Sequence, residues 1–106
     1  MTADFVIVMV TCKDKVEAEK IAKTLLEEKL IACANIVGSV SSFFRWRGNA
    51  DRCEECLVLM KSRVNLFDAL AGRVRSLHSY EVPEVLAFPV VLGSADYLGW
   101  LEDSLK

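Results

Sequence analysis

Hydrophobic positions follow two different periods in the first part of the chain. Residues 5–10 form a continuous apolar and mainly β-branched run, which is typical of a buried strand. Between residues 18 and 26, apolar side chains recur three and four positions apart, which predicts the buried face of a helix of about four turns. Asp14 stands three residues before Glu17, a spacing that favours a capped helix start.

The next part of the chain predicts a long hairpin over residues 31–61. Strand-like residues run from Leu30 to Arg47, and the Gly38-Ser39 pair within them indicates a kink or bulge. Gly48-Asn49 is a turn signal, and the strand pattern returns from Cys53 to Lys61. Charged side chains surround the expected tip.

The last third of the chain predicts two more helices with a strand between them. A helix is expected from near Asn65 to Leu77, and an apolar strand from Val85 to Leu92. Pro89 cannot donate to a neighbouring strand, so this strand should lie at a sheet edge or carry a bulge. A short final helix follows Gly93-Ser94, with one apolar face formed by Tyr97, Leu98, Leu101 and Leu105.

The element order is therefore β-α-β-β-α-β-α, which predicts an α+β ferredoxin-like sandwich with a four-stranded antiparallel sheet. Residues 1–106 are expected to form a single domain, because that length supports one hydrophobic core. The first and last strands are apolar at nearly every position, so both faces of the sheet should be buried. Two helices cover one face only, and the economical cover for the other is another copy of the chain.

Composition and charge narrow the classes of partner. The formal net charge is −2, which argues against nucleic acid as a partner, because phosphate binding needs a basic face. The apolar run near the N-terminus is too short to span a membrane and lacks the basic flank of a signal peptide. We therefore expect a cytoplasmic protein.

Four cysteines, at positions 12, 33, 53 and 56, are expected to be free thiols in that compartment. Cys53 and Cys56 have the CxxC spacing of redox and metal sites, but they fall in a predicted strand. A spacing of three sends strand side chains to opposite faces, so a structural role is favoured.

Residues 78–85, HSYEVPEV, concentrate candidate chemistry around the only histidine of the chain. His78 can be a metal ligand, with Tyr80 and Glu81 orienting it and its second nitrogen free. The alternative is a hydrogen-bonded corner residue before the last strand, and this structural or interface role is favoured over metal binding. In either case Val82 and Val85 are expected to be buried inside the sandwich. Cys33 with His78 is the only candidate nucleophile and base, and no oxyanion-hole motif accompanies it, so no enzyme is predicted.

Four motifs stand in an order and spacing that resembles the CutA divalent-cation tolerance proteins, over essentially the whole chain. They are Ala32-Cys33-Ala34-Asn35-Ile36, the Trp46-x-Gly48 tip, His78-x-Tyr80-Glu81-Val82-Pro83-Glu84 and Asp96-Tyr97-Leu98-x-Trp100-Leu101. The resemblance implies the ferredoxin-like fold, a homotrimer whose hairpins reach across to neighbouring chains, and a role in tolerance to copper and other divalent cations. It implies no enzymatic reaction. Metal ligands proposed in some members fall at Val10 and Leu77 here, so that ligand set is not present.

We expect the HSYEVPEV segment to lie at the mouth of a cleft between subunits, because four polar side chains gather there at the end of a helix. His78, Glu81 and Cys33 are the candidate metal ligands, for copper or zinc, and no cofactor is required. Further residues expected to shape the cleft are Tyr80, Pro83, Glu84, Asn35 and Trp46. The alternative is a sensor trimer similar to the PII signalling proteins, which binds a small anionic metabolite in the same clefts.

Overall fold

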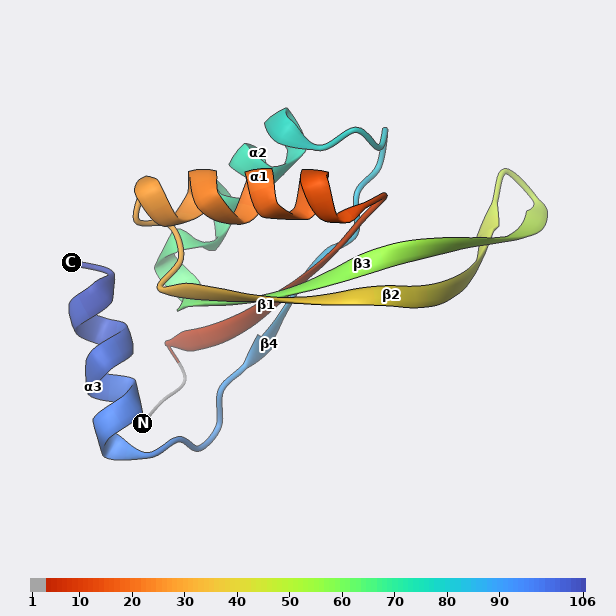
Figure 1. Ribbon diagram of the computed structural model, residues 1–106. Helices are drawn as coiled ribbons and strands as arrows, with labels where there is room; N and C mark the ends of the chain where they lie inside the picture. Colours follow the sequence, from red (N-terminus) through yellow and green to blue (C-terminus); the bar gives the residue numbers. More distant parts are fainter. Residues whose placement is uncertain (1–3) are drawn as a thin grey trace.

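The computed structural model describes residues 4–106 and is built on one four-stranded antiparallel sheet (Figure 1). Its strands are β1 (Phe5–Cys12), β2 (Cys33–Trp46), β3 (Asn49–Arg63) and β4 (Val85–Pro89), in the spatial order β2-β3-β1-β4. Its helices are α1 (Lys15–Glu27), α2 (Phe67–Leu77) and α3 (Ala95–Ser104), and a 3₁₀ turn, Val64–Leu66, precedes α2. The predicted α+β fold and its element order are confirmed.

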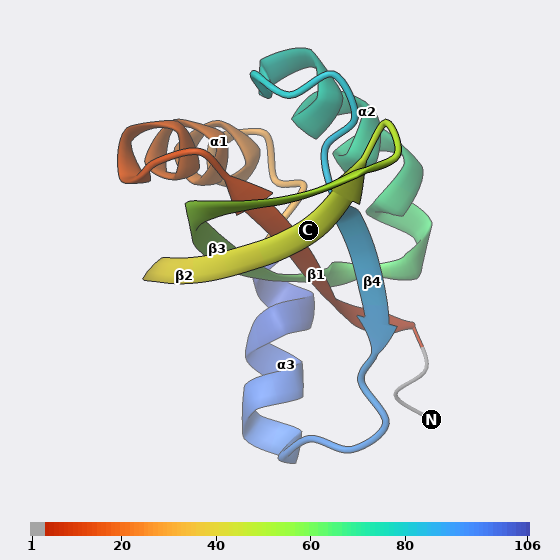
Figure 2. The same cartoon turned by 90° about the vertical axis from the view of Figure 1, so that its right-hand side faces the viewer.

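Helices α1 and α2 lie together on one face of the sheet (Figures 1 and 2). Alternate residues of β1 point toward them, because successive strand side chains face opposite sides. Val8, Val10 and Cys12 are fully buried there, and they pack with side chains of both helices and of β3. The helix residues of this core include Ala18, Ile21, Leu25, Leu70 and Val74.

The β2–β3 hairpin extends well beyond the helices (Figure 1). Its register shifts between Gly38 and Val40, so the predicted bulge is confirmed. Trp46 pairs with Asn49, which places the two-residue turn at Arg47-Gly48, one position earlier than expected. Both turn residues have positive φ, 51° and 84°, as a type I′ turn requires, and the glycine adopts this conformation without strain.

Several predicted strand boundaries were wrong. Strand β3 runs from Asn49 to Arg63 and not from Cys53 to Lys61, because its pairing with β2 continues to the turn. Strand β2 begins at Cys33 and not at Leu30, because the Leu30 amide donates to the Leu25 carbonyl and completes the end of α1. Strand β4 stops at Pro89 and does not continue to Leu92. Among the described residues it pairs with β1, which begins at Phe5, and the ladder between the two strands ends where Val6 pairs with Pro89. The expected edge position of β4 is confirmed.

The other face of the sheet is largely open in the single chain. Paired positions of β1, β3 and β4 place a set of apolar side chains on it: Ile7, Met9, Leu57, Leu59, Leu86 and Phe88. Leu86 and Phe88 are about half exposed. Helix α3 stands at one end of the sheet (Figures 1 and 2), where Leu101 packs with Phe5 and Ala32.

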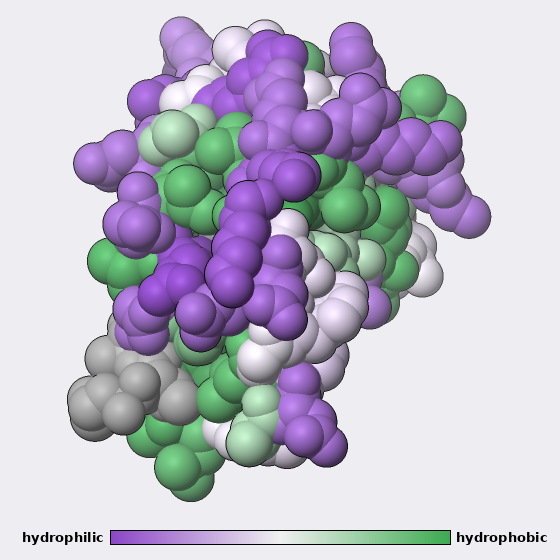
Figure 3. All heavy atoms as spheres, turned by 90° about the vertical axis from the view of Figure 1, so that its left-hand side faces the viewer, coloured by the Kyte–Doolittle hydropathy of each residue, from purple (hydrophilic) through white to green (hydrophobic). Residues whose placement is uncertain are grey.

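The surface at the α3 end of the molecule is more hydrophilic than the open face of the sheet. Seen from that side, hydrophilic side chains form a broad band, with hydrophobic ones beside and below it (Figure 3). Arg63, Glu102 and Lys106 border a shallow hollow there. This end is suited to contact with water. Within residues 4–106, no helix combines the length and apolar character needed to cross a membrane.

Candidate functional site

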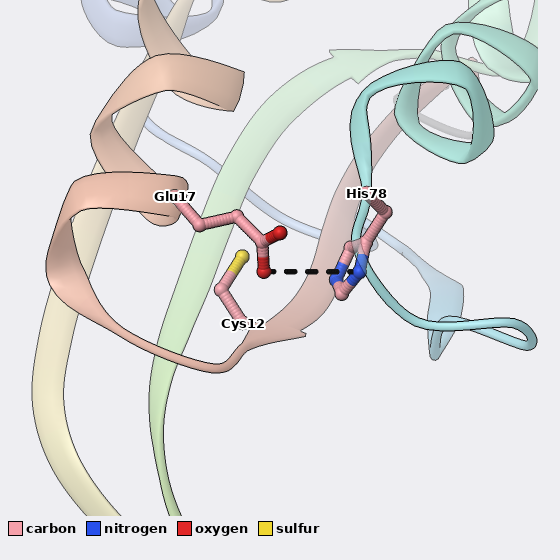
Figure 4. A group of neighbouring side chains, drawn as sticks. All are labelled: Cys12, Glu17 and His78. Carbon is pink, nitrogen blue, oxygen red and sulfur yellow. Dashed lines mark ion pairs between the residues drawn. The ribbon is translucent and has the colours of Figure 1, made fainter.

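Three chain segments meet above the end of β1: the start of α1, the residue after α2, and Cys12 itself (Figure 4). The Asp14 side chain accepts a hydrogen bond from the Glu17 amide at 2.8 Å, which confirms the predicted cap and fixes where α1 begins. His78 ends α2 in an extended conformation, and its amide donates to the Val74 carbonyl at 2.9 Å. These two helix termini direct Glu17 and His78 toward each other.

The His78 ring is fully buried, and both of its nitrogens contact backbone groups. Nε2 lies 2.7 Å from the Thr11 carbonyl oxygen, which only accepts, so Nε2 carries the proton and donates. Nδ1 accepts from the Tyr80 amide at 3.1 Å. The ring is therefore the neutral Nε2–H tautomer. The expectation that its second nitrogen is free was wrong, because the chain folds back through Tyr80 to contact it.

Glu17 is the carboxylate that faces His78, with Oε1 3.8 Å from Nδ1. Its side chain is only 8% exposed. The Ser79 amide donates to Oε2 at 2.8 Å and the Lys13 amide to Oε1 at 3.3 Å. Burial favours the protonated acid, but the hydrogen bonds from Ser79 and Lys13 outweigh it and lower the pKa of Glu17 below its ordinary value. The group is a carboxylate at neutral pH.

Cys12 completes the cluster. Burial, reinforced by the negative charge of Glu17, raises the pKa of its thiol to about 12, so the metal-free side chain is a neutral thiol. One ligand atom from each of Cys12, Glu17 and His78 lies within 4.8 Å of the others. Sequence reasoning found His78 but did not bring it together with Cys12 and Glu17. The available signal was the alternation of β1, which turns Cys12 toward the helices just below the Asp14 cap.

Tyr80 links this cluster to the sheet. Its hydroxyl donates to Glu55 Oε2 at 2.7 Å, and its ring centroid lies 4.7 Å from that of His78. Partial burial and the Glu55 carboxylate both raise the pKa of the Tyr80 phenol. The predicted contact between Tyr80 and His78 is present, through the ring and through the backbone amide.

The three predicted metal ligands are not brought together within one chain. Glu81 does not orient His78, because it forms an exposed ion pair with Arg47 at 2.9 Å. The Cys33 thiol lies 3.5 Å from the Tyr97 hydroxyl on the other side of the sheet. A site made of Cys33, Glu81 and His78 would thus need groups from a second chain. Cys33 and His78, the candidate nucleophile and base, are likewise separated by the sheet within one chain.

A groove of about 750 Å³ lies between the hairpin tip and the loop after α2. Four carboxylates line it, from Asp51, Glu55, Glu81 and Glu84, together with the guanidinium of Arg45. Aromatic side chains form the rest of its wall: Phe43, Phe44, Trp46 and Tyr80.

The other predicted cleft residues have varied positions. Trp46 and Glu84 lie in the groove, and Pro83 is half-buried beside it. Asn35 lies on the open sheet face, where its side-chain oxygen accepts from the Lys61 ammonium. Val82 is 67% exposed and lines the groove, so its predicted burial in the sandwich was wrong for the single chain. Val85 does contact the core.

Comparisons with known proteins agree with one another. The model of the CutA1 divalent ion tolerance protein family matches residues 6–104. The divalent-cation tolerance protein CutA of Thermus thermophilus is 41% identical over 98 residues, covering 92% of this chain and 95% of that protein. Protein CutA of Homo sapiens is 39% identical over 92 residues, and the match covers 87% of this chain but 51% of the human protein.

Solved structures give the same result. The divalent cation tolerance protein Cut A1 of Thermus thermophilus superimposes with a TM-score of 0.92 at 40% identity, covering 94% of this chain and 97% of that one. The periplasmic divalent cation tolerance protein CutA of Archaeoglobus fulgidus gives 0.93 at 34% identity, covering 96% and 99%. None of these names describes an enzyme.

Proposed function

The chain belongs to the CutA1 divalent ion tolerance family, and on this premise we propose that it is a non-catalytic cytoplasmic homotrimer that takes part in the response to divalent cations such as copper. In this proposal the acidic groove forms part of the clefts between the chains, and a cation binds weakly there. Relatives carry names that place them in chloroplasts or the periplasm, so the compartment is part of the proposal.

The acidic groove is the observation that carries the cation role. Four carboxylates line it against one guanidinium, so its walls bear an excess of negative charge. The Glu81 charge is balanced by Arg47, which leaves Asp51, Glu55 and Glu84 to attract a cation. Carboxylate oxygens are ligands that divalent cations accept readily.

The open face of the sheet supports the homotrimer. Its apolar side chains on β1, β3 and β4 lie without helical cover, and soluble monomers rarely leave an apolar patch of that kind exposed. The long hairpin offers further apolar groups, since Phe43 is 75% exposed. Association of copies through these surfaces buries both.

The size of the groove favours a second candidate, a sensor that binds a small metabolite. A volume of about 750 Å³ is far more than one ion fills and is within the range of small-molecule sites. The aromatic walls offer stacking surfaces, and Arg45 offers a partner for an anionic group. We keep this as the alternative ligand for the same clefts.

Light scattering tests the assembly. We expect three times the chain mass of 11.8 kDa at micromolar concentration, and a mass near 11.8 kDa would overturn the trimer. The ligand class is tested by the shift in melting temperature when the protein is mixed separately with Cu²⁺, Zn²⁺, Ca²⁺, nucleotides and dicarboxylates.

Matched variants assign the ligand to the groove. Glu84→Gln removes one groove carboxylate, and Glu27→Gln removes an exposed carboxylate on α1 as a control. The proposal expects a cation-dependent shift that falls in the first variant and persists in the second. A shift with metabolites alone would select the sensor, and equal shifts in both variants would remove the groove from the proposal.

A further inference from the structure

We propose that Cys12, Glu17 and His78 form a second, buried metal site within each chain, specific for a thiophilic divalent cation of the zinc class. The proposal rests on the cation role proposed above in one respect, the class of ligand. It uses none of the groove residues and needs no neighbouring chain.

The geometry suits one small ion. The three ligand atoms lie within 4.8 Å of one another, so a point between them is no more than about 2.8 Å (4.8 Å divided by the square root of 3) from each. Zinc bonds to sulfur, imidazole nitrogen and carboxylate oxygen are about 2.0–2.3 Å long. Movements of roughly 0.5–0.8 Å by each ligand atom would therefore complete the three bonds. The site thus needs side-chain adjustment and no change of fold.

The surrounding hydrogen bonds resemble those that orient metal ligands. The Thr11 carbonyl holds the proton of His78 on Nε2, so Nδ1 keeps a lone pair, which accepts from the Tyr80 amide and lies 3.8 Å from Glu17 Oε1. Metal-binding histidines commonly donate their other ring N–H to a backbone carbonyl in this way. The Lys13 and Ser79 amides hold the carboxylate of Glu17 in place. Figure 4 shows Cys12, Glu17 and His78 turned toward one another from three segments.

The charges also suit a divalent ion. On binding, the Cys12 thiol loses its proton to solvent and a metal–sulfur bond forms, while Glu17 is already ionised and His78 already neutral. The Tyr80 amide gives up its hydrogen bond to Nδ1, a small loss beside three metal–ligand bonds. One thiolate and one carboxylate then balance the two positive charges, so the buried complex is neutral. A neutral complex avoids the cost of an unpaired buried charge.

The choice of ion follows from the donor atoms. A thiolate with an imidazole favours zinc, cobalt and cadmium over magnesium or calcium, which prefer oxygen ligands. The ion has a short way to travel, because the exposed residues Lys13 and Ser79 border the cluster. The groove and this site would therefore respond to different cations.

The test is a titration of the full chain with Co²⁺ in a buffer containing a phosphine reductant and no thiol. We expect one ion per chain and a thiolate-to-cobalt charge-transfer band, which Zn²⁺ removes by competition. Cys12→Ser should abolish the band and weaken Zn²⁺ binding by more than about 100-fold, since even outer partners of ligands contribute about 10–100-fold. Cys33→Ser and Cys53→Ser should keep both, because these thiols lie outside the cluster.

Several outcomes would overturn the proposal. They are the absence of the band from the unmodified protein, its survival in Cys12→Ser, and its loss in Cys33→Ser. The far-ultraviolet circular dichroism of each metal-free variant shows whether it is folded. If Cys12→Ser does not fold, Glu17→Gln replaces it as the test. This variant keeps the thiol and the imidazole and should weaken metal binding. Glu84→Gln separates the two proposals. A cobalt band that stays intact in this variant while its groove response is lost supports the buried site. A band missing from the unmodified protein, whose groove response is intact, rejects the buried site alone.

Discussion

The Tyr80 hydroxyl donates a hydrogen bond to the Glu55 carboxylate, at 2.7 Å, and so joins the loop after α2 to strand β3. The two residues are 25 positions apart, and both line the acidic groove. The backbone amide of Tyr80 also donates a hydrogen bond to Nδ1 of His78. One tyrosine therefore connects the groove to the buried cluster.

Removing that hydroxyl should destabilise the protein. Glu55 is 9% exposed, so Tyr80→Phe leaves a buried carboxylate without this donor. We expect the free energy of unfolding to fall by about 1–3 kcal/mol, measured by urea denaturation at neutral pH. Tyr97→Phe is the matched control, because its hydroxyl lies 3.5 Å from the half-buried Cys33 thiol, a weaker partner than a carboxylate, and its loss should change stability less. Equal losses in the two variants would contradict the special role of Glu55.

Stability should fall at alkaline pH through the tyrosines. Partial burial and Glu55 raise the pKa of Tyr80, and the Cys33 thiol, followed by burial, raises that of Tyr97 to about 12. A raised pKa favours the neutral phenol in the folded state, so its contribution is complete below the ordinary value of about 10 and is lost as pH rises above it. The absorbance of tyrosinate should appear at higher pH in the folded protein than in the protein unfolded in urea. Coincident titration curves would show that neither phenol is perturbed.

The cap of α1 should be worth more than that of α3. Asp14 accepts from the Glu17 amide at 2.8 Å, whereas Ser94 accepts from the Tyr97 amide at 3.3 Å. Asp14→Ala is expected to cost about 1–2 kcal/mol of unfolding free energy, because it also frees Glu17 from its place in the cluster. Ser94→Ala should cost about 0.5 kcal/mol. Thermal or urea unfolding of the two variants measures both losses. A larger loss in Ser94→Ala than in Asp14→Ala would contradict the prediction.

The open sheet face should control assembly. Phe88 lies on β4, opposite Ile7, and is 47% exposed in the single chain. If copies associate through this face, Phe88→Ser should make the mass in solution depend on concentration in the micromolar range, with little loss of helix by circular dichroism. Val16→Ser, at an exposed position of α1, is the control and should leave the mass unchanged. A concentration-independent mass for Phe88→Ser would move the interface elsewhere.

Much of the fold was predictable because its signals are local. The apolar run of β1, the helical spacing in α1 and the Asp14 cap each depend on residues within a few positions of one another. The bulge after Gly38 was also predictable, since glycine weakens regular pairing at its own position. The boundary of β4 was not, because it depends on where β1 begins, some 80 residues earlier in the chain on this numbering.

The sequence by itself determined the element order, the sheet class and the presence of more apolar strand surface than two helices can cover. It also singled out His78, as the only imidazole in the chain. Only the tertiary structure decided what His78 contacts. Its ring bonds to a carbonyl 67 positions away, and it faces Glu17 and Cys12 because α2 returns over the end of β1. Such contacts depend on strand order and helix placement, which no local period in the sequence encodes.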